Sequence, residues 1–135
     1  MTDAGTVAAA AARCIGTPFR PQGRTPGLAL DCADVVIVAL AAVNRFVIDL
    51  HGYRLHGNFE DKVVEALRSV GCHTTKNGSR AGDILLFRVA PLQFHLAVSS
   101  VSALIHAHAG VGRVVESPAN PDWVIVARFR LPNSD

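Results

Sequence analysis

Residues 31–43 read DCADVVIVALAAV, and this stretch decides the fold of the chain. Asp31 is a good N-cap for a helix, and Asp34 stands three residues later in the reciprocal capping position. The residues that follow are almost wholly apolar, so we expect a helix that is buried on most of its sides. Cys32 then falls in the first turn of this helix, where backbone N–H groups and the helix dipole stabilise a thiolate.

Helices and strands occupy different parts of the remaining chain. Residues 6–15 are rich in alanine and should form a helix that ends at Gly16, and residues 59–70 carry an apolar stripe of helical period. Five β-rich runs follow the third helix, at residues 84–89, 94–99, 103–108, 113–116 and 123–130. Helices followed by an antiparallel meander predict one α+β domain over residues 1–135, with the buried helix packed on the sheet.

Composition and charge exclude several classes of protein. Of the 135 residues 50% are apolar and 18% charged, which excludes a disordered segment and a long coiled coil. Mean hydropathy is +0.29, yet the longest apolar run, at residues 35–43, is about half of what a membrane-spanning helix needs. The net charge of +2 is scattered, so we expect no nucleic-acid partner. The first residues carry no basic stretch, which predicts no signal peptide and a chain that is cytoplasmic as synthesised.

The chain has 3 cysteines, Cys14, Cys32 and Cys72, and no CxxC pair. This sparse, odd set does not make a disulfide framework and is typical of a reducing compartment. Cys14 lies in the alanine-rich helix and is expected in the core, whereas Cys72 is expected to be a loop or edge thiol. Cys32 is the candidate nucleophile.

Histidines on two neighbouring predicted strands supply a base for such a nucleophile. Alternation along the first strand puts His95 on the face opposite its apolar neighbours. A tight hairpin then places His95 opposite either His106 or His108, depending on the centre of the turn. Cysteine catalysis needs a base and a third polar group that orients it, and Cys32, His95 and His106 can fill these roles.

Five short motifs follow one another along almost the whole chain. They are Thr17-Pro18-Phe19-Arg20, Asp31-Cys32, Gly82-Asp83-Ile84-Leu85-Leu86-Phe87, His95-Leu96-Ala97-Val98 and Leu104-Ile105-His106-Ala107. As an ordered set they resemble the motifs of the NlpC family of papain-like cell-wall cysteine peptidases. The likeness is greatest to the short, single-domain members carried by phage tails and gene transfer agents, which the run Arg113-Val114-Val115-Glu116-Ser117 also fits.

The resemblance implies a fold, an activity and a set of site residues. The fold would be papain-like, with N-terminal helices and the nucleophile helix packed on an antiparallel sheet of about five strands. Cys32 matches the nucleophile, His95 the base and His106 the third polar residue of a hydrolase that cuts the peptide stems of bacterial peptidoglycan without a metal or cofactor. The positions expected to bind substrate are Phe19, Arg20, Asp31 and Ala33. Subunits of a phage-tail-like particle are the further partners implied, with delivery to the cell wall by such a particle.

The chain departs from the family pattern at three positions. The family usually has Tyr where this chain has Phe19, and Ser-Gly where it has Ala33-Asp34. Ala33 has no hydroxyl to offer a substrate, and Asp34 adds a negative charge near the thiol. The substrate and the strength of the activity therefore stay open.

Two other functions remain as alternatives. The substituted positions and the apolar surplus fit a non-enzymatic or degenerate module that binds cell wall or a neighbouring subunit. His106 and His108 on one strand, with His95 nearby, also have the spacing of a zinc site with one open position for water.

Overall fold

The structure is a computed structural model that describes residues 2–18, 32–47, 60–91, 93–108 and 110–132, and the backbone alone at residues 24–25, 29–30 and 59. In chain order its elements are α1 (Asp3–Ala12), β1 (Arg24–Thr25), β2 (Ala29–Leu30), α2 (Cys32–Ala41), α3 (Phe59–Ser69), β3 (His73–Thr74), β4 (Ile84–Ala90), β5 (Gln93–Ser99), β6 (Leu104–His108), β7 (Arg113–Ser117) and β8 (Val124–Arg130). No helix in this part of the chain is long and apolar enough to cross a membrane.

The predicted buried helix is present as α2. It begins at Cys32, and most of its residues are buried, as the apolar run indicated. Asp34 is wholly buried too, whereas Asp31, the expected N-cap, lies outside the described residues. α2 packs against α1 on one side and against β5 and β6 on the other.

The first helix starts three residues earlier than predicted. The side chain of Thr2 caps α1, since its Oγ1 accepts a hydrogen bond of 3.0 Å from the backbone N–H of Gly5. α1 ends at Ala12, and turns carry the chain on to Gly16, which has a φ of +92°. The prediction was wrong about the start because it weighed alanine content above this cap.

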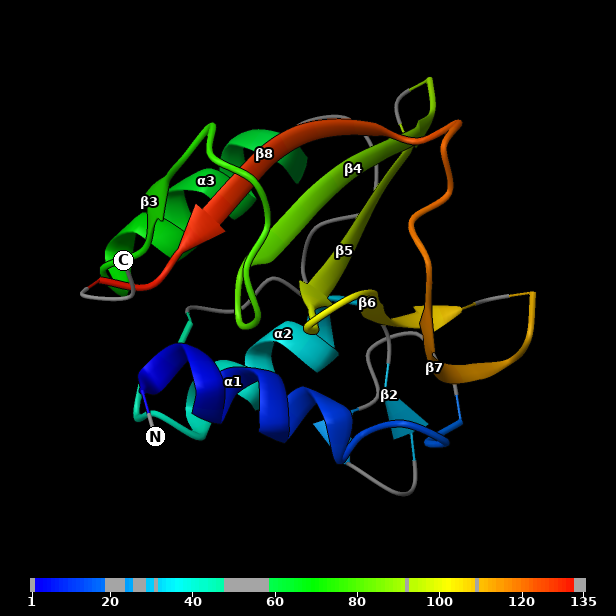
Figure 1. Cartoon of the computed structure of the whole chain (residues 1–135), viewed down its shortest axis with the longest axis horizontal. Coiled ribbons are helices and arrows are strands. Elements are labelled where there is room, and N and C mark those ends of the chain that lie inside the picture. Colours follow the sequence, from blue (N-terminus) through cyan, green and yellow to red (C-terminus); the bar gives the residue numbers. More distant parts are fainter. Residues whose placement is uncertain are drawn as a thin grey trace.

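The main sheet has six strands in the order β3-β8-β4-β5-β6-β7, and all of its pairs are antiparallel (Figure 1). The predicted α+β class is therefore confirmed. Strands β4 to β7 form the predicted meander, but β8 returns to lie between β3 and β4. This placement buries Phe129, which pairs with Ile84 of β4.

Side chains on the two faces of the sheet belong to two hydrophobic clusters. The main core cluster joins the helices to one face, with Leu96, Val98 and Ile105 among its members. A smaller cluster on the other face consists of Leu85, Phe87, Ala97 and Leu104, with Val89 and Trp123 packed against it. Pairing of Leu85 with Ala97 and of Phe87 with His95 puts His95 on the face of this second cluster.

The Gly82-Asp83 motif joins the start of β4 to two other elements. Asp83 accepts hydrogen bonds from Arg130 of β8, at 3.0 Å from Nε and 2.8 Å from Nη2, and both side chains are buried. Gly82 has a φ of +91°, and a Cβ at this position would lie 2.2 Å from the carbonyl oxygen of Ala4 in α1. Asp83 therefore links β4 to β8, and Gly82 allows α1 to pack closely against the start of β4.

Candidate active site

His95 and His106 lie in direct contact. Nε2 of His95 on β5 is 2.8 Å from Nδ1 of His106 on β6, and the two rings are almost perpendicular, at 83°, with centroids 4.9 Å apart. His106 is 2% exposed and His95 is half-buried. The two histidines that the sequence picked out therefore share a hydrogen bond that is largely withdrawn from water.

The register of the hairpin alone would have suggested a different partner for His95. The β5–β6 ladder consists of Val98 with Ile105 and Ser99 with Leu104, and if it continued it would set His108 opposite His95. The ladder stops there, and β6 runs away from β5 (Figure 1). His106, the diagonal neighbour, is then the residue whose ring reaches His95.

Ser117 and Trp123 complete the surroundings of the pair. Ser117, the last residue of β7, has its Oγ 2.9 Å from Nε2 of His106. The ring of Trp123 lies 5.1 Å from that of His95 and 5.8 Å from that of His106, with edge-on geometry in both cases. The Trp123 ring also contacts Phe87 at 5.4 Å.

Sequence reasoning gave neither of these two residues a part in the site. Ser117 belongs to the run Arg113–Ser117, but its distance from His106 along the sequence does not indicate a contact. Only the pairing of β6 with β7 brings the two residues together. Trp123 packs against the second cluster on this face of the sheet. Only the return of β8 beside β4 brings Trp123 to the histidines.

Both histidines are held in the neutral form at neutral pH. Burial, and then the neighbouring His106 and His108, lower the pKa of His95 to about 3. Burial, and then His108, lower the pKa of His106 to about 4. A neutral imidazole has one N–H and one lone pair, so each ring donates through one nitrogen and accepts through the other.

Cys32 is placed by its helix. It is the first residue of α2, is 1% exposed and belongs to the main core cluster. Because α2 packs on β5 and β6, the thiol lies on the element that covers the strands of both histidines. The structure thus joins His95 to His106 by a hydrogen bond and sets Cys32 at the start of the adjoining helix.

The other two cysteines are buried. Cys14 is in the main core cluster, as predicted. Cys72 was expected at a loop or edge, but it also packs in that cluster, and burial, offset in part by Arg45, raises its pKa to about 11. None of the three cysteines forms a disulfide.

Of the four positions expected to bind substrate, Ala33 alone lies in the described part of the chain. Phe19, Arg20 and Asp31 fall outside it. Ala33 is 4% exposed, and its methyl group packs in the main core cluster. The methyl group of Ala33 is therefore not in a position to contact a substrate.

The structure does not support the alternative of a zinc site. Among the described residues, no group of three or more His, Cys, Asp or Glu side chains could hold a metal ion. Both ring nitrogens of His106 are already hydrogen-bonded, to His95 and to Ser117. His108 accepts a hydrogen bond of 3.1 Å at Nδ1 from the backbone N–H of Val111. His106 therefore has no lone pair to offer a metal without giving up one of these bonds.

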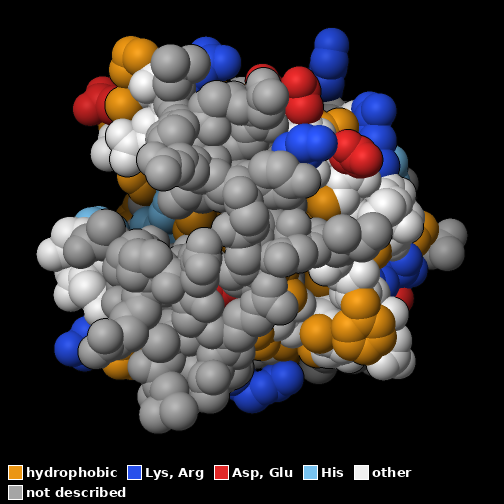
Figure 2. Space-filling model, turned by 180° about the vertical axis from the view of Figure 1, so that it is seen from behind, with side chains coloured by type: hydrophobic (Ala, Val, Ile, Leu, Met, Phe, Trp, Pro, Cys, Tyr) orange, Lys and Arg blue, Asp and Glu red, His pale blue; other side chains and the backbone are white. Residues whose placement is uncertain are grey.

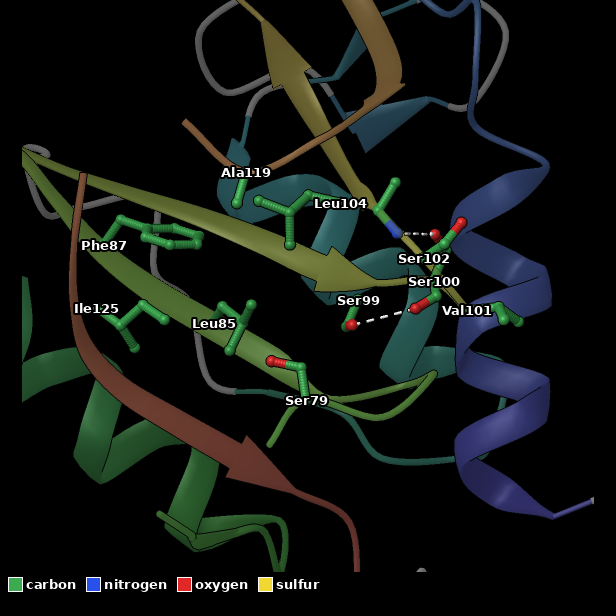
Figure 3. Close-up of a pocket in the computed structure, with 11 residues that line it drawn as sticks. Ser79, Leu85, Phe87, Ser99, Ser100, Val101, Ser102, Leu104, Ala119 and Ile125 are labelled. Carbon is green, nitrogen blue, oxygen red and sulfur yellow. Dashed lines mark hydrogen bonds between the residues drawn. The ribbon is translucent and has the colours of Figure 1, made fainter. Parts of the chain in front are cut away.

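A pocket of about 270 Å³ lies on the face of the second cluster. Leu85, Phe87 and Leu104 line it together with serines, among them Ser79 and Ser99 (Figure 3). Phe87 also contacts the ring of Trp123, and that ring contacts both histidines. On the side of the molecule turned away in Figure 1, histidine side chains are visible in a recess beside hydrophobic ones (Figure 2).

Comparison with solved structures finds the same fold in other proteins. The chain is similar over 96% of its length to NlpC1 and NlpC2 from Trichomonas vaginalis, with TM-scores of 0.71 and 0.72 and identities of 17% and 16%. It is similar, again over 96% of its length, to the P60 domain of an antigen from M. avium subspecies paratuberculosis, with a TM-score of 0.61 and 16% identity. It spans 44% and 46% of the two Trichomonas chains and 93% of the P60 domain.

By sequence, no protein-family model and no curated protein matches the chain. Its likeness to known proteins therefore lies in the path of the backbone, at identities where only the fold is shared. The chain has the papain-like α+β fold of NlpC/P60 domains.

Proposed function

We propose that the protein is a cysteine hydrolase in which Cys32 is the nucleophile, His95 the base and His106 the group that orients the base. The observation that carries this proposal is the hydrogen bond between His95 and His106, on two strands against which α2, the helix that begins at Cys32, packs. The fold likeness to NlpC/P60 domains supports the same assignment.

The reaction would be acyl transfer through a thioester. The Cys32 thiol gives its proton to His95, and the sulfur attacks the carbonyl carbon of an amide. The C–N bond breaks as His95 returns the proton to the leaving amine. Water then attacks the thioester, and His95 takes its proton. The C–S bond breaks to release a carboxylic acid, and His95 returns the proton to the Cys32 sulfur. The N–H groups of the first helical turn, which lack partners within a helix, are suited to hold the oxyanion.

This mechanism sets one requirement on geometry. The rings of His95 and His106 lie on the face of the second cluster, whereas α2 packs on the other face. Cys32 must meet His95 at the opening beyond the last pair of the β5–β6 ladder. A thiolate at that opening would raise the pKa of His95, because an opposite charge stabilises the imidazolium.

The substrate we propose is the peptide stem of bacterial peptidoglycan. The ordered motifs of the sequence and the fold of NlpC/P60 domains both favour a cell-wall peptide over other amides. The closeness of those motifs to phage-tail and gene-transfer-agent members favours action as part of such a particle at the cell wall.

Digestion of purified peptidoglycan tests the activity. The wild type should release muropeptides, and Cys32→Ala should release none above background. Cys72→Ala is the matched control, because it removes another buried thiol, which stands between α3 and β3 in the chain. Equal release by the wild type and Cys32→Ala would overturn the proposal.

Alkylation separates the enzyme from a non-enzymatic module. An activated Cys32 should react with iodoacetamide in the folded protein at neutral pH, and peptide mass spectrometry should find the label on this residue. Cys14 and Cys72 are internal controls, since burial raises the pKa of both thiols. A Cys32 that reacts no faster than Cys72 would favour the non-enzymatic module.

A further inference from the structure

Ser117 ends a chain of hydrogen bonds that begins at His95. Its Oγ is 2.9 Å from Nε2 of His106, and Nδ1 of the same ring is 2.8 Å from Nε2 of His95. Ser117 stands opposite Leu104 in the β6–β7 ladder, two residues from His106 along β6, so the sheet itself fixes its place. Both ring nitrogens of His106 are therefore hydrogen-bonded, Nδ1 to His95 and Nε2 to Ser117.

Two directions of donation satisfy this chain when both rings are neutral. In the first, Nε2–H of His95 donates to Nδ1 of His106, and Nε2–H of His106 donates to Ser117. In the second, the Ser117 hydroxyl donates to His106, whose Nδ1–H then donates to His95. A serine hydroxyl can donate or accept, so the geometry permits both directions.

The proposed chemistry requires the first direction. A base at His95 must have its lone pair on Nδ1, which leaves the proton on Nε2 facing His106. Once His95 carries a second proton, Nε2 can only donate, and Nδ1 of His106 has to accept. The second direction would set two N–H groups against each other across 2.8 Å.

We propose that Ser117 is a positioning residue that accepts a hydrogen bond from Nε2 of His106 and so holds this ring in its Nε2–H tautomer. The inference rests on the proposed function, because the role of His95 as a base sets the direction of the chain. Ser117 acts through His106 and does not touch the substrate.

Valine and threonine make a matched pair of substitutions at this position. They have nearly the same shape, both suit a β-strand, and only threonine keeps the hydroxyl. Ser117→Thr should retain the rate of muropeptide release. Ser117→Val should lower kcat about tenfold, the effect of one lost hydrogen bond, with little change in KM. Equal kcat values for the two variants would overturn the proposal.

The tautomer of His106 gives a readout that does not depend on activity. In the ¹⁵N-labelled wild type at pH 7, Nε2 of His106 should have the ¹⁵N chemical shift of a protonated ring nitrogen, and Nδ1 that of an unprotonated one. The signals of His106 are identified as those that disappear in His106→Asn. Ser117→Thr should keep this pattern, and Ser117→Val should give a mixture of tautomers. A wild type with its proton on Nδ1 contradicts the inference even if Ser117→Val does not fold.

The two proposals fail in different ways. If Cys32→Ala digests peptidoglycan as well as the wild type, the hydrolase proposal fails, whatever the tautomer of His106. If Cys32→Ala is inactive but the proton lies on Nδ1 of His106, the hydrolase stands and the role of Ser117 is wrong.

Discussion

At the scale of single residues, the His95–His106 pair makes stability depend on pH. The folded pKa values, about 3 and about 4, lie below the ordinary value of 6.5. Between pH 6.5 and these values the unfolded chain therefore binds more protons than the folded one. The pair costs no stability above pH 6.5, and the free energy of unfolding falls as the pH is lowered below it, by at most about 1.4 kcal/mol per pH unit for each ring.

Replacement of one ring should flatten this dependence. We expect His106→Asn to lose less unfolding free energy than the wild type between pH 6.5 and 4.5, since asparagine does not titrate. Urea unfolding at several pH values measures the free energy of unfolding of both proteins. The contribution of the carboxylates, which the two proteins share, drops out of the difference. Parallel curves for the two proteins would mean that His106 does not resist protonation.

Trp123 offers a direct view of the same titration. It is the single tryptophan of the chain and contacts both imidazoles. A protonated imidazole quenches indole emission, so fluorescence should report the charge of the pair. We expect steady emission from pH 7.5 down to about pH 5 in the folded protein, because the pKa values of both rings lie lower. A step near pH 6.5 would show that the rings titrate as exposed histidines do.

The sequence predicted the histidines of the site but not all of their contacts. Alternation was enough to put His95 on the face opposite its apolar neighbours, and the strand pattern put His106 within reach. The choice between His106 and His108 depends on where the β5–β6 ladder ends, which is set by how α2 and the other strands pack. Phe19, Arg20 and Asp31 stay predictions.

At the scale of elements, the buried ion pair of Asp83 and Arg130 joins β4 to β8. Arg130 also donates to the carbonyl of Gly78 at 2.9 Å, and the N–H of Arg80 donates to Asp83 at 2.8 Å. Arg130→Met would leave the carboxylate of Asp83 buried without its main partner. We expect a loss of about 3–5 kcal/mol in the free energy of unfolding, measured with urea.

Two further variants test this account of the ion pair. Arg128→Met on the same strand should cost less than about 1 kcal/mol, because its hydrogen bonds to Ser79 and Asn77 are exposed. Adding Asp83→Asn to Arg130→Met should recover part of the loss, since it removes the unpaired charge. A double variant that loses the sum of the two single effects would argue against a coupled pair.

Gly82 should be the least replaceable glycine of the described chain. Alanine there meets two penalties, a positive φ of +91° and a collision with the backbone of Ala4. Gly16 has a similar φ of +92° but open space around it, so it is the matched control. We expect Gly16→Ala to cost about 1 kcal/mol and Gly82→Ala about 1–3 kcal/mol more, by thermal or urea unfolding. Equal losses of unfolding free energy in the two variants would mean that α1 shifts to make room for the new methyl group.

Most elements could be predicted from local patterns, and their ends less well. α2 and α3 begin within one residue of the predicted starts, and β4 to β8 lie within one residue of the predicted runs at either end. These segments have strong apolar periods, which decide the type of element. The two-residue strand β3 has no such period, and it was missed because only its pairing with β8 makes it a strand.

At the scale of the whole molecule, the α+β class was predictable but the order of the strands was not. Each hairpin from β4 to β7 joins strands that are neighbours in sequence, and short turns bring such strands together. β8 has the same apolar pattern whether it extends the meander beyond β7 or returns to β4. Its place is decided by contacts far apart in the sequence, such as Phe129 with Ile84 and Arg130 with Asp83.

The position of β8 also has a consequence for the order in which the molecule assembles. The hairpins from β4 to β7 can form from local contacts, but β4 keeps one open edge until β8 arrives from about 40 residues further along the chain. During that interval the apolar edge of β4 can accept a strand from any chain, including β8 of a second copy. We expect refolding to be slow and its yield to fall as protein concentration rises, with exchanged dimers among the products.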